Sequence, residues 1–302
     1  MKFNFDTKPG QQLIKECRQE EITPKVSIVT PYYNSGKHFE ETFRCVINQT
    51  FEDYEWIIVN DGSTNEEDVN ILEEFAKKDA RIRVLHQENG GQSKAKNHAI
   101  KESNTDIIVF LDADDLVEPF YVEYLYKALE HHPQAGWSYM DLVGFEAVEY
   151  VWCKRFSAGR MTFNNILVNS AAFRKKHLND VGCFSEVEKY YDEDWALYLK
   201  LLEKGIHPVH IPVIGFWYRK SQSGMQQTVR KNRELREKSD KYIEQLARKI
   251  KLNIKCELYR GELPIEAIRS EYGQVDRVIA QICATGIGCF CMKKLYQMRN
   301  NC

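Results

Sequence analysis

A five-residue apolar run that ends in crowded carboxylates constrains the fold of this chain more than any other feature. Residues 107–111 read Ile-Ile-Val-Phe-Leu, a pattern typical of a central strand buried on both faces. Asp112, Asp114 and Asp115 follow directly. Like charges this close repel one another and are tolerated mainly where a strand emerges into solvent or where a cation neutralises them. Ligands of open α/β sheets bind beyond the carboxyl ends of the strands, so we expect a metal or a substrate there.

Short strand-like runs alternate with helical patterns along the first part of the chain. Strands are expected at residues 26–30, 55–60, 82–86 and 107–111, and helices at about 38–48, 66–77 and 94–100. One strand and one helix every 25 to 30 residues, roughly, is typical of βαβ units. The first part is therefore predicted to form a doubly wound, mostly parallel α/β sheet with right-handed crossovers.

The second part of the chain alternates less regularly. The expected elements are a helix from Pro119 to about residue 131, a strand at 136–141, an irregular or antiparallel excursion at 142–168, a short helix at 169–178, a helix from Asp192 to Gly205 and a strand at 209–218. A basic helical extension follows, because eleven Lys or Arg residues stand against four acids between Arg219 and Lys251. We divide the chain into an N-terminal arm (1–24), a main domain (25–220) and this extension (221–302).

Composition places the chain among globular proteins, because 43% of its 302 residues are apolar, enough for a buried core. A formal net charge of -2 argues against a dedicated nucleic-acid binder. The nine cysteines form no CxxC pair and the chain starts without a signal-peptide pattern, so we expect reduced thiols in a cytoplasmic protein.

The least polar stretch of the chain, residues 278–292, is too short and too interrupted by Gly286 and Gly288 to span a bilayer. Lys293 and Lys294 follow it directly, which leaves open a peripheral contact with a membrane surface. A packed terminal helix is the favoured interpretation.

Two of the three crowded carboxylates have the spacing of a cation site. Side chains two residues apart in extended backbone point to the same side, so Asp112 and Asp114 can hold one divalent cation together. A site made of oxygen atoms favours Mg²⁺ or Mn²⁺ over zinc. The alternative is a solvated loop that caps the helix after Pro119. Three acids directly after a buried strand favour the metal site.

Three further segments carry groups that could bind a nucleotide or take part in catalysis. Asp61 follows a strand end and could accept hydrogen bonds from a base or a ribose, although by itself it is an ordinary Asp-Gly turn. The Asn-Gly-Gly loop at 89–91 precedes a helix with Lys94 and Lys96 and offers amides and cations to a phosphate, although it matches no GxGxxG or Walker pattern. Asp194 lies in the first turn of a helix, where an ionised carboxylate could be a general base or simply a cap.

Five motifs follow one another along the main domain. They are Val26-Ser-Ile-Val-Thr-Pro-Tyr-Tyr-Asn34, Ile58-Val-Asn-Asp-Gly-Ser63, Glu88-Asn-Gly-Gly-Gln-Ser-Lys-Ala-Lys-Asn97, Phe110-Leu-Asp-Ala-Asp-Asp115 and Glu193-Asp-Trp-Ala-Leu197. In this order and spacing they resemble the family 2 glycosyltransferases over about residues 25–220. The resemblance implies the glycosyltransferase A fold, a nucleotide-diphosphate sugar (a UDP-sugar first) as donor, a divalent metal and inversion at the anomeric carbon. It also implies a nucleotide-binding half, residues 25–118, and an acceptor half, residues 119–220.

The resemblance implies roles for individual residues as well. The donor would contact Thr30, Pro31, Tyr33, Asp61 (toward the uracil or its equivalent), Asn89, Gly91, Lys96 (where the family often has Arg) and Asp112. Asp114 would ligate the metal together with Asp112, and Asp194 would take the proton from the acceptor hydroxyl. Many relatives carry a His shortly after a Tyr-Arg pair, whereas Lys220 follows Tyr218-Arg219 here. Lys220, His210 or a water is left to complete the site.

We therefore expect a cytoplasmic, metal-dependent, inverting glycosyltransferase that extends a surface polysaccharide or a lipid-linked glycan. One alternative is a sugar nucleotidyltransferase, which has less support because no glycine-rich, basic segment follows the first strand. Another is a non-catalytic nucleotide- or glycan-binding module on the same fold, against which the intact set of Asp112, Asp114 and Asp194 argues.

Overall fold

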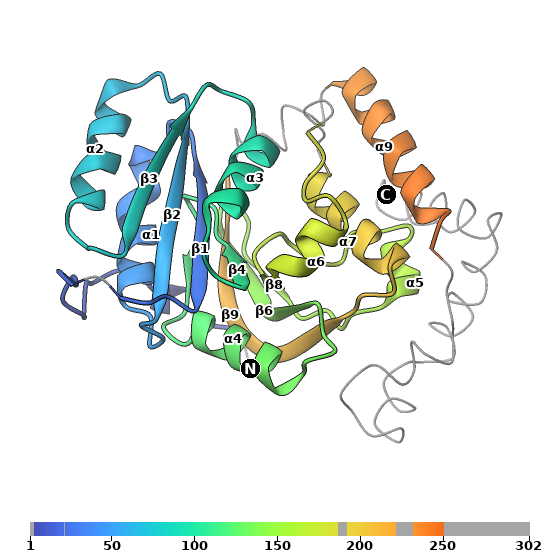
Figure 1. Cartoon of the computed structure of the whole chain (residues 1–302), viewed down its shortest axis with the longest axis horizontal. Coiled ribbons are helices and arrows are strands. Elements are labelled where there is room, and N and C mark those ends of the chain that lie inside the picture. Colours follow the sequence, from blue (N-terminus) through green and yellow to red (C-terminus); the bar gives the residue numbers. More distant parts are fainter. Residues whose placement is uncertain (1–2, 21, 187–191, 222–231, 251–302) are drawn as a thin grey trace.

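One sheet crosses the molecule, and helices cover both of its faces (Figure 1). The structure is a computed structural model that describes residues 3–20, 22–186, 192–221 and 232–250. The strand order is β3 (Ile82–Gln87), β2 (Tyr54–Asp61), β1 (Val26–Tyr32), β4 (Ile107–Phe110), β8 (Ala172–Arg174), β6 (Trp137–Glu146), β9 (Pro208–Lys220) and β5 (Leu116–Val117), and β7 (Tyr150–Trp152) pairs with β6.

The first four of these strands form the predicted doubly wound unit. β1 pairs in parallel with β2 and β4, and β2 pairs in parallel with β3. Alternate strand residues enter two apolar layers. Ile28 belongs to the layer covered by α1 (Gly36–Ile47) and α2 (Glu66–Ala76), whereas Val29 belongs to the layer covered by α3 (Gln92–Glu102). Strands buried on both faces are apolar at nearly every position, which is why the sequence predicted this α/β unit.

The second half of the sheet is mixed. β8 runs antiparallel to both β4 and β6, and β5 runs antiparallel to β9, although β6 and β9 are parallel. The short helix expected at 169–178 is wrong for 172–174, because Ala172 and Phe173 are buried in a strand between β4 and β6. Helix α6 (Lys175–Asp180) begins only after that strand. "Mostly parallel" therefore describes the first half of the sheet and not the second.

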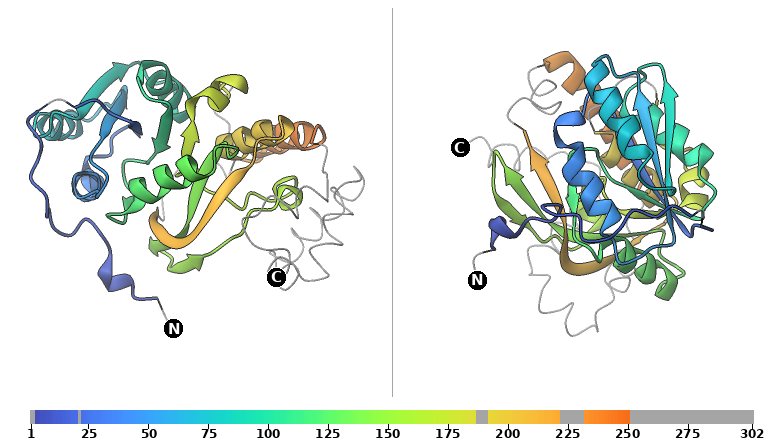
Figure 2. Two further views of the ribbon diagram at one scale, coloured as in Figure 1. Left: turned by 60° about the horizontal axis from the view of Figure 1, so that its bottom comes forward. Right: turned by 90° about the vertical axis from the view of Figure 1, so that its left-hand side faces the viewer.

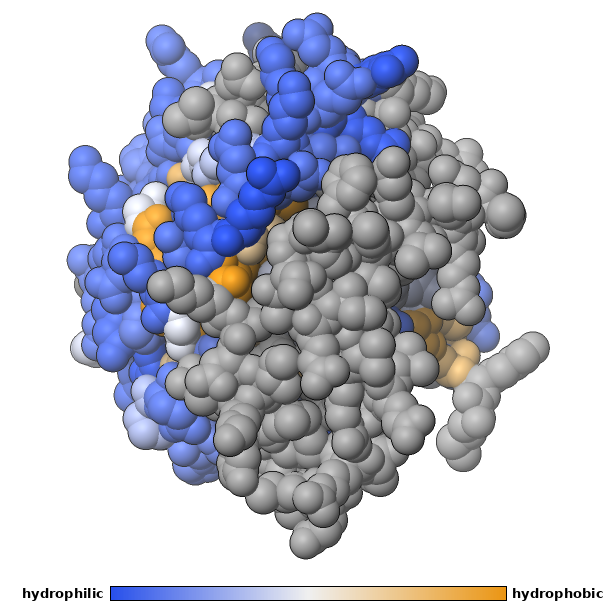
Figure 3. Space-filling model, turned by 90° about the vertical axis from the view of Figure 1, so that its right-hand side faces the viewer, coloured by the Kyte–Doolittle hydropathy of each residue, from blue (hydrophilic) through white to orange (hydrophobic). Residues whose placement is uncertain are grey.

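The other helical elements are η1 (Phe5–Thr7), α4 (Tyr121–His131), α5 (Ala158–Met161), α7 (Glu193–Glu203) and α9 (Arg233–Ala247). Trp195, Leu199 and Leu202, which are spaced i, i+4 and i+7, are buried on α7. α9 packs beside α7 and lies within the extension that was predicted to be helical. Residues 222–231 and 251–302, with the apolar run at 278–292, lie outside the described residues. On the face seen in Figure 3 the described surface is largely hydrophilic, and none of the described helices is long and apolar enough to cross a membrane.

The N-terminal arm lies along the outside of the main domain (Figure 2). The ring centres of Phe3 and Phe5 lie 5.3 and 6.2 Å from that of Trp217 on β9. Farther along the arm, the backbone N–H of Arg18 donates to the carboxylate of Asp79 at 2.9 Å. The arm is thus tied to parts of the domain that are distant from it in sequence.

Candidate active site

Two predicted site carboxylates lie at the carboxyl edge of the parallel strands. Asp61 ends β2, and Asp112 follows the end of β4 by two residues. β1 lies between these strands in the sheet, so its end, at Tyr32, belongs to the same edge. The fold therefore brings three of the five sequence motifs to one side of the molecule, as expected for an open α/β sheet.

Residues 112–115 form a tight turn, here called the carboxylate turn, whose backbone is held from two sides. Oγ1 of Thr42 on α1 lies 3.0 and 2.9 Å from two of its carbonyl oxygens. Nε of Arg219 on β9 donates to a third, the Asp114 carbonyl, at 2.6 Å. The turn is therefore fixed by side chains from elements far apart in sequence.

Asp115 points inward and supports the carboxylate turn. It is 1% exposed, and its Oδ1 accepts a hydrogen bond from the backbone N–H of Arg219 at 2.7 Å. Burial, followed by the charges of Asp114 and Asp112, raises the pKa of Asp115 well above its usual range. So enclosed a carboxyl group is poorly placed to hold a metal, which leaves Asp112 and Asp114 as the candidate ligands.

Asp112 and Asp114 have the character of a cation site. Asp112 keeps 27% of its side chain exposed and accepts a hydrogen bond from Nε2 of Gln92 at 2.8 Å. Burial, followed by the charge of Asp112, raises the pKa of Asp114 to about 6. A divalent cation would relieve this repulsion, and oxygen atoms suit Mg²⁺ or Mn²⁺. Within the described ranges no cluster of three His, Cys, Asp or Glu residues forms a metal site, so water or a diphosphate would have to supply further ligands.

Lys96 on α3 presents a buried amine to this site. Its side chain is 0% exposed, and Nζ lies 3.7 Å from Oδ1 of Asp112 and 3.9 Å from Oε1 of Glu193. Both distances are too long for a hydrogen bond, and Nζ has no acceptor in the part of the chain that the structure describes. A buried ammonium group without an acceptor is costly, so this position suits an anion that arrives with a ligand.

The start of α7 carries the predicted base. Asp194 accepts hydrogen bonds from the backbone N–H of Trp195 at 2.6 Å and from Nδ2 of Asn165 at 3.3 Å. Burial, followed by the charge of Asp192, raises the pKa of Asp194 to about 6. Burial also raises the pKa of the adjacent Glu193, to about 8. Asp194 is thus ionised at neutral pH yet more basic than an ordinary aspartate, which is what a general base requires.

Asp61 holds the loop that precedes α3. Its Oδ1 accepts hydrogen bonds from Nε2 of Gln87 at 2.7 Å and from the Gly90 N–H at 2.8 Å, and its Oδ2 accepts one from the Gly91 N–H at 2.8 Å. Gly62 follows with a φ of +69°, and a Cβ there would lie 2.7 Å from a backbone nitrogen of the same loop. Asp61 is therefore more than an ordinary Asp-Gly turn, because it fixes this loop. The Gly90 and Gly91 amides that were expected to bind a phosphate donate to Asp61 instead.

The other predicted donor contacts differ in exposure. Tyr33 (46% exposed) and Asn89 are exposed, whereas Pro31 and Gly91 are half-buried. Thr30 is completely buried, and its hydroxyl accepts a hydrogen bond from Nε1 of Trp56 at 2.9 Å. The prediction that Thr30 lines the nucleotide pocket is therefore wrong for its side chain, because strand alternation turns that side chain into the core.

The two side chains suggested to complete the site lie in different surroundings. Nε2 of His210, near the start of β9, lies 2.8 Å from Oδ1 of Asp141, and its ring stacks on Tyr139. Nζ of Lys220 lies 3.9 Å from the ring centre of Tyr218, whose pKa is raised by burial and then by the charges of Asp115, Asp112 and Asp194. The contacts of His210 give no support to its role, whereas Lys220 lies beside the site and its role stays a prediction.

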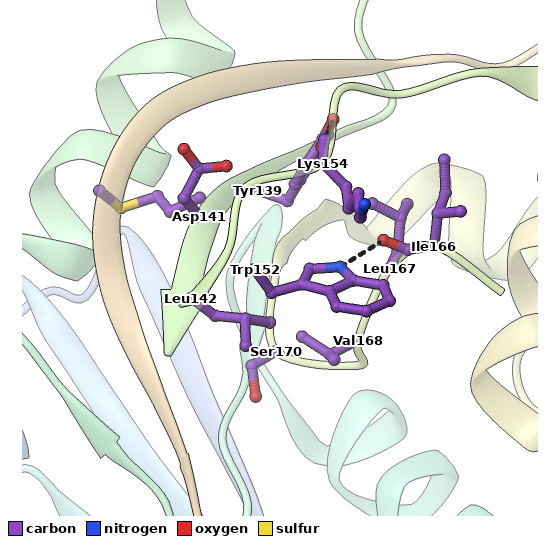
Figure 4. A pocket seen from close by; sticks show the side chains of 10 residues that line it. Tyr139, Asp141, Leu142, Trp152, Lys154, Ile166, Leu167, Val168 and Ser170 are labelled. Atoms are coloured by element: carbon purple, nitrogen blue, oxygen red, sulfur yellow. Dashed lines mark hydrogen bonds between the residues drawn. The ribbon is translucent and has the colours of Figure 1, made fainter. Parts of the chain in front are cut away.

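A small cavity lies in the second half of the domain, between the β6–β7 hairpin and residues 166–170 (Figure 4). Nε1 of Trp152 donates to the Ile166 carbonyl there at 3.1 Å, next to Asn165, which contacts Asp194. The free volume of about 10 Å³ has room for a water molecule and not for a sugar ring. The cavity therefore belongs to the packing behind the candidate base.

Sequence reasoning missed several residues that shape this site. Gln92 stands one helical turn before Lys96, so the i, i+4 spacing on α3 could have placed both side chains beside Asp112. Thr42 and Asn165 come from segments with no local pattern that points to the site.

The fold is of the glycosyltransferase A class. It joins a parallel α/β half to a mixed half, and it places paired carboxylates after a central strand near the acidic start of α7. The chain belongs to glycosyl transferase family 2, since the model of that family matches residues 27–185. This assignment confirms the family resemblance, although the fifth motif, at 193–197, lies beyond the matched residues.

Curated relatives match over a shorter part of the chain. It is 41% identical over 123 residues to the uncharacterized glycosyltransferase EpsJ of Bacillus subtilis, a match that covers 41% of this chain and 34% of EpsJ. It is 40% identical over 106 residues to the glycosyltransferase GlyG of Streptococcus pneumoniae, covering 35% of each chain. The matched part spans about a third of the length of these relatives.

Solved structures share the fold at low identity. TarS of S. aureus in complex with UDP-GlcNAc has a TM-score of 0.60 at 18% identity and covers 81% of this chain and 69% of its own. The mannosyltransferase PcManGT of Pyrobaculum calidifontis, in complex with GDP-Man and Mn2+, has a TM-score of 0.53 at 15% identity and covers 95% of this chain and 90% of its own. At such identity these similarities show the fold.

Proposed function

We propose that this chain is a metal-dependent, inverting glycosyltransferase that moves a sugar from a nucleotide-diphosphate sugar to a hydroxyl of a glycan or lipid-linked acceptor. The observation that carries the proposal is the buried amine of Lys96, which lies between Asp112 and Glu193 and has no hydrogen-bond acceptor among the described residues. A fixed cation beside two candidate metal ligands is suited to the charge that develops on a departing diphosphate.

The chemistry assigns one step to each group. Asp194 takes the proton of the acceptor hydroxyl as the acceptor oxygen attacks the anomeric carbon. The bond from that carbon to the diphosphate oxygen breaks on the opposite face, and its electron pair leaves with the nucleotide diphosphate. Lys96 stabilises the resulting negative charge.

Asp112 and Asp114 would hold the divalent cation, Mn²⁺ or Mg²⁺. When bound, the cation supplies Lewis-acid stabilisation of the diphosphate charge. Gln92 orients Asp112 by its 2.8 Å hydrogen bond, and Arg219 and Thr42 fix the backbone that carries Asp114. Among the structural neighbours, the PcManGT complex with GDP-Man and Mn2+ supports the use of a metal.

A UDP-sugar is the first donor to test, because TarS was solved with UDP-GlcNAc. GDP-sugars are the second candidate donors, because PcManGT was solved with GDP-Man. We further propose that the reaction takes place in the cytoplasm and serves surface polysaccharide or lipid-linked glycan synthesis. Peripheral contact with a membrane belongs to the same proposal.

Thermal unfolding with UDP, GDP and their sugars, each with and without MnCl₂, tests donor binding. We expect a higher midpoint with one nucleotide family and a further increase with MnCl₂, because a ligand that binds the folded state stabilises it. Lys96→Met should abolish this response. No response to any nucleotide would contradict the proposal, whereas binding without sugar transfer would favour the non-catalytic module.

A further inference from the structure

The N-terminal arm contacts the back of the carboxylate turn through two ion pairs in series. Nζ of Lys8 lies 2.7 Å from Oε1 of Glu41 on α1. Oε2 of the same carboxylate accepts a hydrogen bond from Nη2 of Arg219 at 2.5 Å. Glu41 therefore uses one oxygen for the arm and the other for the residue that holds the turn.

Arg219 links Glu41 to the carboxylate turn. Its side chain is 2% exposed, its Nε donates to the Asp114 carbonyl at 2.6 Å, and its Nη1 donates to Glu146. Because the guanidinium is planar and rigid, the carboxylates that hold its Nη atoms also set the direction of its Nε–H. The position of the Asp114 carbonyl thus depends on Glu41.

The arm is seated on the same two elements that these ion pairs join. Gly10 has a φ of +79°, and a Cβ there would lie 2.6 Å from the carbonyl oxygen of Glu41, so glycine lets the arm lie flat on α1. The ring of Phe5 lies 6.2 Å from that of Trp217, two residues before Arg219 on β9. Apolar packing and a close backbone approach therefore bring Lys8 to Glu41.

Charge gives the lysine a specific role. Arg219 faces two carboxylates, Glu41 and Glu146, close to the three further carboxylates of the carboxylate turn. Lys8 adds a second positive charge. It therefore offsets part of the negative charge that Glu41 brings to this cluster of carboxylates while Glu41 binds Arg219. Lys8 and Glu41 keep 31% and 27% of their side chains exposed, so solvent screens the pair and its effect is modest.

We propose that the N-terminal arm is a positioning element of the active site, in which Lys8 acts through Glu41 and Arg219 to hold the carboxylate turn in the geometry that binds the metal and the diphosphate. The residues matched by the family begin at 27, so the arm lies outside them. The consequence for donor binding rests on the proposed function, whereas the consequence for the turn itself does not.

Point variants of the full chain test this role. Lys8→Met keeps the aliphatic stem and removes the charge, Lys8→Arg restores the charge, and Gly10→Ala lifts the arm without changing a charge. Lys15→Met is the matched control, because Lys15 makes an arm ion pair of similar exposure with Glu52 at 2.6 Å and donates to the Gln49 carbonyl at 2.7 Å, and neither contact involves Arg219 or residues 112–115. Hydrogen exchange of the Asp115 and Arg219 amides without ligand reports on the turn. Calorimetry with UDP or GDP in MnCl₂ reports on donor binding.

We expect Lys8→Met and Gly10→Ala to exchange these amides faster and to bind the nucleotide with Mn²⁺ about threefold to tenfold more weakly. Lys8→Arg and Lys15→Met should stay close to the wild type in both measurements. Unchanged exchange in Lys8→Met, or equal acceleration in Lys15→Met, overturns the positioning role. If Lys8→Met exchanges these amides faster but the wild type binds neither UDP nor GDP, the arm does position the carboxylate turn. The proposed function is then the part that is overturned.

Discussion

Nζ of Lys96 lies 3.7 Å from Oδ1 of Asp112, close enough for attraction and too far for a hydrogen bond. The amine is completely buried, so its position is set before any ligand arrives. A cation held in place in this way stabilises a developing negative charge without having to reorganise. The same arrangement is costly in the ligand-free protein, because the ammonium group is buried and finds no hydrogen-bond acceptor in the described part of the chain.

Replacing Lys96 by Met should therefore lower activity far more than stability. We expect transfer to fall by about 10²- to 10³-fold, as when one preorganised donor is removed from a catalytic site. The free energy of unfolding without nucleotide should change little, because the variant loses the attraction to Asp112 at 3.7 Å and also loses the cost of a buried ammonium group that has no hydrogen-bond acceptor among the described residues. Urea unfolding and initial rates measure the two effects, with Lys101→Met, exposed on the same helix, as control. A variant that is less stable but binds nucleotide normally would show Lys96 to be structural.

The pH dependence of transfer should report on Asp194. Because burial and the charge of Asp192 raise its pKa to about 6, the rate at saturating donor should fall as the pH falls through about 6 and the base becomes protonated. Asp192→Asn removes the neighbouring negative charge, so the ascending limb should move to lower pH. Asp180→Asn, whose side chain on α6 is 60% exposed, serves as control. A limb that stays in place in Asp192→Asn would contradict the assignment of Asp194.

Stability without ligand should depend on pH through the same helix start. The pKa values of Glu193 and Asp194 are about 8 and about 6 in the folded protein, above their usual values, so the folded state binds more protons than the unfolded state. This stabilisation is complete at acidic pH and is lost as the pH rises from about 4 to about 8. Glu193→Gln should flatten the upper part of this dependence in urea titrations. An identical slope in the variant and the wild type between pH 6 and 8 (roughly the window of Glu193) would contradict this prediction.

Asp61→Asn should loosen the loop before α3 whether or not a nucleotide is present. An asparagine can replace one carboxylate oxygen, but its amide group then faces a backbone N–H that needs an acceptor, at Gly90 or at Gly91. We expect a loss of about 1–3 kcal/mol in the free energy of unfolding, the usual cost of an unsatisfied buried donor. Chemical denaturation measures it. A loss of nucleotide affinity with unchanged stability would instead indicate direct contact with the base.

The parallel half of the fold follows from the sequence because its strands are buried on both faces and separated by helices of ordinary length. β8 could not be recognised in the same way, since a three-residue strand has too little pattern to distinguish it from the helix that begins at Lys175. β6 also runs past its expected end to Glu146, because β9 and β7 supply pairing partners that no local pattern reveals.

The sequence alone predicted those site residues that are charged and stand at the end of a strand or the start of a helix. The acids of the carboxylate turn follow a strand and Asp194 lies at a helix start, where a carboxylate is a candidate metal ligand or general base. Thr30 was assigned to the pocket through family resemblance, yet its direction depends on strand alternation, and it points into the core. The link from Lys8 through Glu41 to Arg219 joins three distant segments, so only the folded structure brings it together.

Asp194→Asn tests the central claim most directly. Single-turnover transfer would be measured with a panel of nucleotide sugars and hydroxyl acceptors in MnCl₂, alongside donor affinity by calorimetry. We expect the wild type to form a glycoside of inverted anomeric configuration with one nucleotide diphosphate released per transfer. The variant should bind the donor normally and transfer about 10²- to 10⁴-fold more slowly, the range for loss of a general base. A variant that binds the donor and transfers at the wild-type rate would contradict the role of Asp194 as the base.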